Sequence, residues 1–231
     1  MQPTIILIPG LMNDAWIWSG QIAALSRHGA VLVARNDGFD SLAAMADDLL
    51  GRTCGPLAVA GHSMGGRVAL EMFRRAPERI DRLALLDTGV HGRRDHEREG
   101  RMKLVDLART EGMGAVVEAW LPQMLAPGVV RGGPVWQGIA DMLQRADADI
   151  FASQQNALLT REDAEPLLAQ VKVPVALIVG RDDGWSPPEQ HEAMTRHLAH
   201  SRLTVIENAG HMAPLEKPDA VADALVDWLK M

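Results

Sequence analysis

The sequence predicts an α/β fold, in which a doubly wound and mostly parallel sheet of about six strands carries a helical insertion. Short apolar segments recur along the chain, and each is followed by a stretch with helical periodicity. The apolar segments do not alternate with polar residues, so both faces of each strand are expected to be buried. Only one interval between strands is much too long for a simple connection.

Six segments are expected to form strands because each is short, apolar and free of alternation. They are residues 4–8, 31–34, 57–60, 83–86, 175–179 and 203–206. The amphipathic stretches predict helices that cover the sheet. They are residues 41–50, 65–76, 187–198 and 219–229. Ser41 is placed to cap the first of these helices.

The long interval lies between the fourth and fifth strands. Its helical patterns cover residues 101–110, 114–124, 135–145 and 149–160, and prolines and glycines separate them. We expect a helical lid at residues 91–165, inserted into a core made of residues 1–90 and 166–231. The alternative is a second helical domain with a partner of its own.

Composition narrows the class of protein. The chain has 231 residues, of which 47% are hydrophobic and 23% charged, which is typical of a globular protein. A net charge of -7 argues against a nucleic-acid partner. One cysteine, Cys54, excludes a disulfide framework. No apolar run is long enough for a membrane helix and no signal peptide is recognisable, so we expect a cytoplasmic protein without a membrane partner.

A candidate nucleophile lies between the third strand and the helix that follows it. The segment 61–66 reads GHSMGG, which matches the G-x-S-x-G pattern of a sharp strand-to-helix turn with an exposed serine hydroxyl. Gly61 and Gly65 are expected because a Cβ at either position would collide with the neighbouring strand or helix. The alternative is a glycine-rich turn in which Ser63 only caps a helix.

A serine hydroxyl needs a base, and the base needs an acid. His211 follows the last strand, so it is expected at the same edge of the sheet as Ser63. Asp182 and Asp183 follow the fifth strand, and either of them can supply the acid. The other histidines lie in short links, charged runs or polar helices. The chain order Ser, Asp, His is that of the α/β-hydrolase arrangement.

An oxyanion intermediate needs preformed N–H donors. The backbone amide of Met64 follows the nucleophile and lies at the positive end of a helix. The second donor is expected from the loop after the first strand, where Gly10 lets the backbone turn inward and presents the amide of Leu11.

These segments together resemble the α/β-hydrolase superfamily, and specifically its small, lidded, esterase-like members. The matching segments are PGLMNDAWIW at 9–18, GHSMGG at 61–66, LLDTG at 85–89, GRDDGWSPP at 180–188 and NAGHMAPLEKPDAV at 208–221. The resemblance implies that Ser63 is the nucleophile, His211 the base and the Leu11 amide an oxyanion donor. The family's acid stands three residues after a strand-ending Gly and four before a Pro, which selects Asp183.

The chain also departs from the family pattern. Pro9 stands where the family usually has His, which leaves the later amide of Leu11 in place. The first strand corresponds to the family's third, so the family's N-terminal hairpin is expected to be missing and one sheet edge exposed. An exposed edge can pair with a second chain, so we expect a monomer or a homodimer.

Large apolar groups in the insertion and beside the acid predict an apolar pocket. Trp120, Met124, Trp136 and Trp185 are the expected substrate-binding residues, while other apolar residues at helical spacing form the core of the lid. The arginines at 93, 94, 98 and 101 are interpreted as solvated, although they could meet an anionic substrate. We expect no cofactor and no metal, since no phosphate-binding motif occurs and the Asp37 segment lacks the later glutamate of a calcium loop.

The function predicted from these residues is a serine hydrolase that cleaves small to medium, apolar carboxylic esters through an acyl-enzyme. The small-molecule ester is its expected partner. The same triad can also serve lactone or carbon–carbon bond hydrolysis, cofactor-free haloperoxidase chemistry or hydroxynitrile lyase chemistry. A hydrolase-like receptor that binds its ligand with negligible turnover is the alternative from another class.

Overall fold

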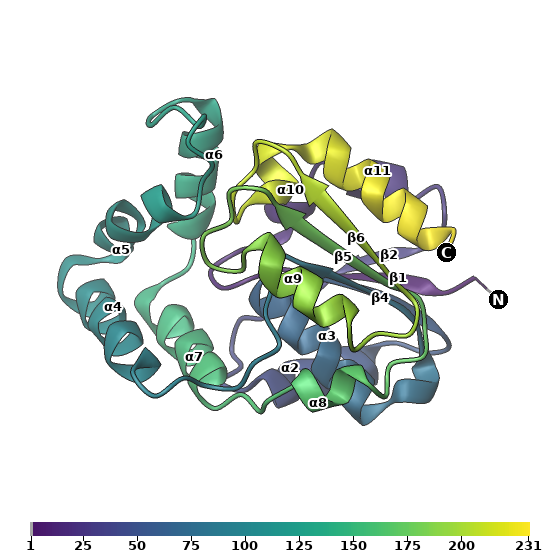
Figure 1. The fold of residues 1–231 in the computed structure, drawn as a ribbon. Coiled ribbons are helices and arrows are strands. Elements are labelled where there is room, and N and C mark those ends of the chain that lie inside the picture. The colour runs from purple at the N-terminus through teal and green to yellow at the C-terminus, as the bar shows by residue number, and fades with distance from the viewer. Residues whose placement is uncertain (1) are drawn as a thin grey trace.

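A six-stranded sheet forms the centre of the computed structural model, which describes residues 2–231 (Figure 1). All neighbouring strands are parallel, in the order β2-β1-β3-β4-β5-β6. The strands are β1 (Thr4–Ile8), β2 (Val31–Val33), β3 (Leu57–His62), β4 (Ile80–Leu86), β5 (Val175–Gly180) and β6 (Ser201–Ile206). The predicted α/β fold with about six parallel strands is therefore confirmed.

Helices cover both faces of this sheet. They are α1 (Ile22–Leu25), α2 (Leu42–Arg52), α3 (Met64–Arg75), α8 (Glu165–Leu168), α9 (Pro188–Thr195), α10 (Ala213–Glu216) and α11 (Pro218–Leu229). Helices α2 and α3 pack together, and α1 packs against α11. The Ser41 hydroxyl accepts a hydrogen bond from the Ala44 amide and caps α2, as expected. The short helices α1, α8 and α10 lie outside the segments that were predicted to form helices.

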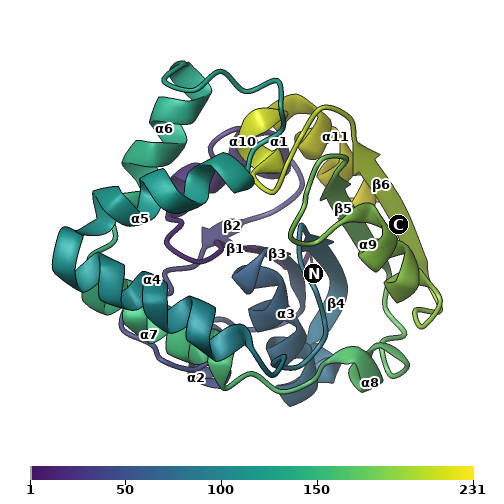
Figure 2. The same cartoon turned by 60° about the vertical axis from the view of Figure 1, so that its left-hand side comes forward.

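Four helices lie between β4 and β5: α4 (Glu97–Glu111), α5 (Met113–Trp120), α6 (Pro134–Leu143) and α7 (Ala148–Leu159). Figures 1 and 2 both show them grouped beyond one end of the sheet. Helix α4 packs against α5 and α7, and α6 contacts α5 and α10. Leu121, Met142 and Phe151 are fully buried and form part of the core of this group. Within residues 2–231 no helix is both long and apolar enough to cross a membrane.

The edge strands differ from the expectation that both faces of every strand are buried. Strands β3 and β5 are buried at every position, whereas β2 is half-buried throughout and β6 is half-buried or exposed at all positions except Ile206. The helices pack over the middle of the sheet, so an edge strand has both a missing neighbour and an incomplete cover. Apolar composition alone does not reveal which strands lie at an edge.

The strand register brings the loops that carry chemistry to one edge of the sheet. Ile8 of β1 lies beside Gly61 of β3, and His62 lies beside Leu86 of β4. Strand β1 has β2 on one side and β3 on the other, so the chain winds in opposite directions from this point. The loops after β1 and β3 therefore diverge and leave a crevice, which is where open α/β sheets bind ligands.

Candidate active site

Ser63 occupies a sharp turn between β3 and α3. Its backbone has φ 53° and ψ -116°, a left-handed conformation that side chains other than glycine rarely adopt. The two flanking glycines make this turn possible. A Cβ on Gly61 would lie 2.1 Å from the Gly65 carbonyl oxygen, and a Cβ on Gly65 would lie 2.1 Å from that of Ile8. Close packing of strand and helix thus holds the Ser63 hydroxyl out into the cavity.

The structure brings together the three side chains that the sequence nominated. His211 Nε2 lies 2.9 Å from Ser63 Oγ, and His211 Nδ1 lies 2.9 Å from Asp183 Oδ2. An ionised carboxylate can only accept hydrogen bonds, so Nδ1 carries the proton and Nε2 is left to accept from the serine hydroxyl. A hydroxyl, an imidazole and a carboxylate are thus joined in the order that nucleophilic catalysis requires.

Asp183, and not Asp182, contacts the imidazole. Asp183 is 2% exposed, and its Oδ1 accepts hydrogen bonds from the amides of Trp185 at 2.8 Å and Ser186 at 3.0 Å. Burial raises the pKa of Asp183, but the charge and hydrogen bond of His211 and the two amide bonds outweigh burial and hold the pKa below its usual value. Asp182 is exposed and takes part through its backbone amide, which donates to Ala209.

The two residues expected to supply oxyanion donors lie at the same cavity as Ser63. Leu11 and Met64 both line it, and neither amide donates to another group in the described part of the chain. A Cβ on Gly10 would lie 3.1 Å from Ser63 Cβ and 2.9 Å from His62 Nδ1, so only glycine lets the Leu11 loop come this close. Both residues therefore lie beside Ser63 with amides that have no other partner among residues 2–231, as an oxyanion site requires.

His62 has a role that the sequence did not reveal. Its ring is completely buried, its Nε2–H donates to the His211 carbonyl at 2.7 Å, and its Nδ1 accepts from Asn13 Nδ2 at 3.2 Å. Burial, assisted by the nearby His211, lowers the pKa of His62 to about 3, so the ring is neutral at physiological pH. His62 therefore fixes the backbone of His211. Its position next to Ser63 in the sequence was the only available signal.

Glu216 ties the His211 loop to the inserted helices. Its Oε1 accepts from the amides of Gly210 at 3.0 Å and Met212 at 3.1 Å, while its Oε2 accepts from the Ala126 amide at 2.8 Å. Burial raises the pKa of Glu216, although these three hydrogen bonds oppose the rise. The loop that carries His211 is thus attached at both flanks to one carboxyl group.

A cavity of about 990 Å³ opens over Ser63 and His211. Three of the expected substrate-binding residues, Trp120, Met124 and Trp185, line it. The ring centroids of Trp120 and Trp185 are 4.7 Å apart, and the ring centroid of Trp185 lies 5.2 Å from that of His211. These side chains make an apolar wall beside the triad.

Trp136 is the exception, because it does not line the cavity as expected. It is 7% exposed and lies in α6, a helix that packs against α5 and α10. The Arg131 guanidinium lies 5.5 Å from the centre of its ring. An apolar residue in the insertion can face either the cavity or a neighbouring helix, and helical spacing does not distinguish the two.

The interpretation of the arginines as solvated is wrong at one position, Arg101. Arg101 is half-buried and lines the cavity. Arg94 also lines the cavity but is exposed, whereas Arg93 and Arg98 are exposed and do not line it. Two further arginines that the sequence did not single out, Arg67 of α3 and Arg161 after α7, also line it. Within residues 2–231, no group of three or more His, Cys, Asp or Glu side chains is suited to hold a metal ion.

The chain matches the Alpha/beta hydrolase family over residues 5–224, which is nearly its whole length. It belongs to this family. The fold, the turn at Ser63 and the order of the three candidate residues along the chain are consistent with membership. The chain is therefore a hydrolase with the α/β-hydrolase fold.

Three similar proteins illustrate the range of activities in this family. The pimeloyl-[acyl-carrier protein] methyl ester esterase of Nitrosomonas europaea is 27% identical and covers 94% of this chain and 92% of its own. A thermophilic esterase from Thermogutta terrifontis superposes with a TM-score of 0.90 at 31% identity, over 99% of this chain and 89% of the other. The enol-lactonase from Burkholderia xenovorans gives a TM-score of 0.90 at 28% identity, over 100% and 92%.

Proposed function

We propose that this α/β hydrolase is a serine hydrolase that cleaves carboxylic esters through an acyl-enzyme intermediate. The observation that carries the proposal is the chain of two 2.9 Å contacts from Asp183 through His211 to Ser63. A serine hydroxyl is a weak nucleophile near neutral pH, and an adjacent, oriented base is what activates it. The unpartnered amides of Leu11 and Met64 at the same cavity supply the remaining requirement.

The proposed reaction has two halves. His211 Nε2 takes the Ser63 proton as Oγ attacks the ester carbonyl, and the amides of Leu11 and Met64 stabilise the oxyanion. Asp183 keeps the proton on Nδ1 and stabilises the imidazolium. His211 then protonates the leaving alcohol, and the acyl group stays on Ser63. In the second half His211 takes a proton from water, which attacks the acyl-enzyme, and the carboxylic acid leaves.

The inserted helices serve in this proposal as a lid. Cavity-lining residues between 91 and 161 come from the insertion, while Ser63 and His211 come from the core. A volume of about 990 Å³ lies at the upper end of the range for small-molecule sites. The wall formed by Trp120, Met124 and Trp185 favours an ester with an apolar part of small to medium size.

The names of the similar proteins support ester cleavage, since they describe a methyl ester esterase, an esterase and an enol-lactonase. Lactone opening uses the same attack on a carbonyl, so a substrate panel that includes lactones distinguishes the two preferences. A ligand receptor with the same fold would bind such compounds tightly without turnover.

Labelling with a fluorophosphonate probe, followed by peptide mapping, tests the proposal. The probe reacts with an activated serine, so we expect the label on Ser63. Ser186 also lines the cavity and is the internal comparison, because an unselective reaction would label both. Ser63→Ala should lower hydrolysis of p-nitrophenyl butyrate by at least about 10³-fold. Unchanged turnover in Ser63→Ala, or a label on another residue, would refute the assignment.

A further inference from the structure

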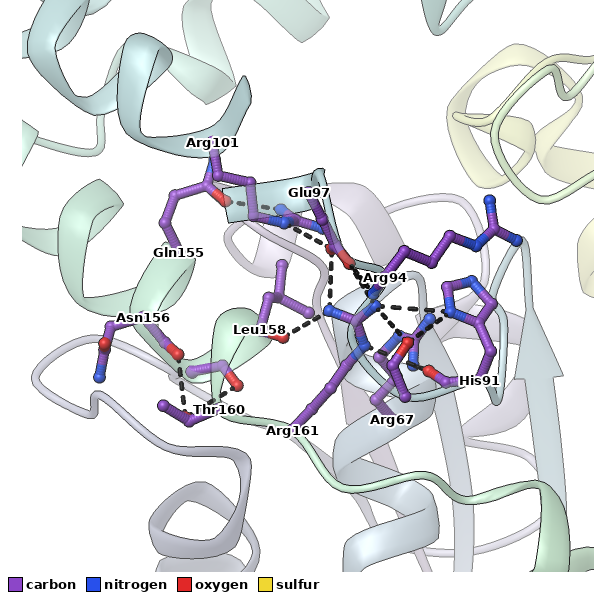
Figure 3. A network of polar contacts seen from close by, with 12 residues as sticks. Arg67, His91, Arg94, Glu97, Arg101, Gln155, Asn156, Leu158, Thr160 and Arg161 are labelled. Atoms are coloured by element: carbon purple, nitrogen blue, oxygen red, sulfur yellow. Dashed lines mark hydrogen bonds and ion pairs between the residues drawn. The ribbon is translucent and has the colours of Figure 1, made fainter. Parts of the chain in front are cut away.

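The cavity has a second, cationic end that the proposed ester chemistry does not use. Arg67, Arg94, Arg101 and Arg161 line it together with Gln155, and we call this set the arginine end (Figure 3). The carboxylates that line the cavity beside it are those of Asp95 and Glu97. Four guanidinium groups thus face two carboxylates, in a protein whose net charge is -7.

One of these arginines is fully used by the protein. Arg161 forms a two-pronged ion pair with Glu97, with Nη1 to Oε1 at 2.8 Å and Nη2 to Oε2 at 2.7 Å. Its other N–H groups donate to the carbonyls of His91, Gly92 and Leu158. The Arg161 side chain is 1% exposed, so this pair belongs to the framework of the site.

Glu97 is shared with Arg101, which leaves it no capacity for the remaining cations. Arg101 Nε donates to Glu97 Oε1 at 2.7 Å, and Arg101 Nη1 donates to Gln155 Oε1. These cations outweigh the effect of burial and lower the pKa of Glu97 to about 2, so its charge is fully present at neutral pH. The carboxylate is already surrounded by two guanidinium groups.

Three groups at the arginine end remain without an anionic partner among residues 2–231. The one acceptor for the Arg67 side chain is the His91 carbonyl, at 2.8 Å from Nη1. The Arg94 side chain is exposed and donates to no described group, and Figure 3 shows it extending away from Glu97, past the His91 ring. Gln155 is 1% exposed, and its Nε2 is a buried donor that has no acceptor.

The unused donors of Arg67 and Gln155 are costly unless something accepts from them, because both side chains are at least half-buried, whereas Arg94 is exposed. Burial and the neighbouring guanidinium groups lower the pKa of Arg67 to about 9, which still leaves the group charged at neutral pH. A partly buried cation without a counter-ion and a buried amide without an acceptor both lose hydration on folding. An oxyanion bound in the cavity would meet both requirements.

We propose that the arginine end binds an ionised oxyacid group of the substrate, a carboxylate or a phosphate, by hydrogen bonds from Arg67, Arg94 and Gln155. The preferred substrate is then an ester that carries this anion a short distance from the bond to be cleaved. Only the preference for an anionic ester rests on the proposed function, because anion binding itself needs no catalysis.

The position of Arg67 relative to Ser63 supports one ligand that spans both groups. Arg67 lies in the first turn of α3, which begins directly after Ser63, and both residues line the same cavity. Planar guanidinium groups bind carboxylates and phosphates through paired hydrogen bonds, which favours these anions over a neutral polar group. The apolar wall of Trp120 and Trp185 is left for the remainder of the ester.

Catalytic preference is the first test. We would measure kcat/KM for monoethyl adipate, which is an anion at pH 7.5, and for its neutral counterpart diethyl adipate. Wild-type protein is expected to prefer the anionic ester by at least about tenfold. Arg67→Gln should bring that ratio close to one, Arg67→Lys should restore part of it, and Arg98→Gln, an exposed cation on α4, should leave it unchanged.

Equilibrium binding to Ser63→Ala, measured by calorimetry, separates the inference from the proposed function. Pentanoate and butyl phosphate are the two anionic ligands, and pentanol is the neutral one. The inference is supported if either anion binds more tightly than pentanol and this difference is lost in Ser63→Ala/Arg67→Gln. The anion that binds more tightly identifies the preferred oxyacid. Equal binding of all three overturns it. Failure of the proposed function would instead appear as absent fluorophosphonate labelling and absent hydrolysis of both esters.

Discussion

Asp183→Asn is the substitution whose consequence follows most directly from the structure. Asparagine has nearly the shape of aspartate, and its Oδ1 can still accept from the amides of Trp185 and Ser186. Its Nδ2, however, can only donate. The group that faces His211 Nδ1 therefore changes from an acceptor to a donor.

The magnitude follows from the tautomer that this change imposes. In the wild-type protein Nδ1–H donates to Asp183 Oδ2, which leaves Nε2 to accept from Ser63 at 2.9 Å. With asparagine the ring must accept at Nδ1, so its proton moves to Nε2 and faces the serine hydroxyl. The base is then blocked and the imidazolium loses its counter-charge. We expect kcat to fall by about 10⁴-fold, or about 5.4 kcal/mol of activation free energy.

The assay is the steady-state hydrolysis of p-nitrophenyl butyrate, together with the rate of fluorophosphonate labelling and the free energy of unfolding in urea. Asp182→Asn is the matched control, because it removes a neighbouring carboxylate that is exposed and does not contact His211. The free energy of unfolding should change by no more than about 2 kcal/mol in Asp183→Asn, since the hydrogen bonds from the Trp185 and Ser186 amides persist. The reasoning fails if Asp183→Asn keeps more than a tenth of wild-type kcat, or if Asp182→Asn loses as much.

Three further substitutions test the surroundings of the triad. His62→Leu removes the donor to the His211 carbonyl and should lower kcat/KM by about 10- to 100-fold. His62→Gln keeps a donor, so its kcat/KM should fall less. Equal losses in kcat/KM would contradict a positioning role. Burial raises the pKa of Asp87 well above its usual value, so its carboxyl group destabilises the fold increasingly as pH rises above 3.8. In urea unfolding, the free energy of unfolding of Asp87→Asn should therefore rise relative to that of wild type by up to about 1.4 kcal/mol per pH unit. A difference that does not depend on pH would count against this. Glu97→Gln leaves the buried Arg161 without its counter-charge and should lower the free energy of unfolding by about 3 kcal/mol near pH 7. This effect should disappear as pH falls from 4.5 towards 2, because wild-type Glu97 is then protonated. A similar loss at pH 2 would be inconsistent with the ion pair.

Local patterns in the sequence were sufficient for the framework of the fold and for the turn at Ser63. The apolar segments predicted all six strands, and the signal is clearest at β3 and β5, which are covered on both faces. Gly61 and Gly65 predicted the turn, because no side chain fits between strand and helix there. The polar edge of β6 and the short helices α1, α8 and α10 were missed, since neither short helices nor edge positions have a strong periodic signal.

The sequence alone determined which residues follow the strands, and therefore which chemical groups reach one edge of the sheet. Only the tertiary structure decided which of them touch. Asp183 rather than Asp182 faces His211 because the turn after β5 buries one side chain and exposes the other. Trp136 is buried outside the cavity, beside Arg131, and the His62 ring donates a hydrogen bond to the backbone carbonyl of His211.

The arginine end shows the same division most clearly. Arg67, Arg94 and Arg161 are far apart in the chain, and the sequence around each of them does not distinguish it from an ordinary surface arginine. They line one cavity because α3, the segment before α4 and the segment after α7 converge around it (Figure 3). Periodicity encodes the burial of apolar residues, since that depends on neighbours along one element. The environment of a charge depends on distant elements, and that information becomes available only when the chain is folded.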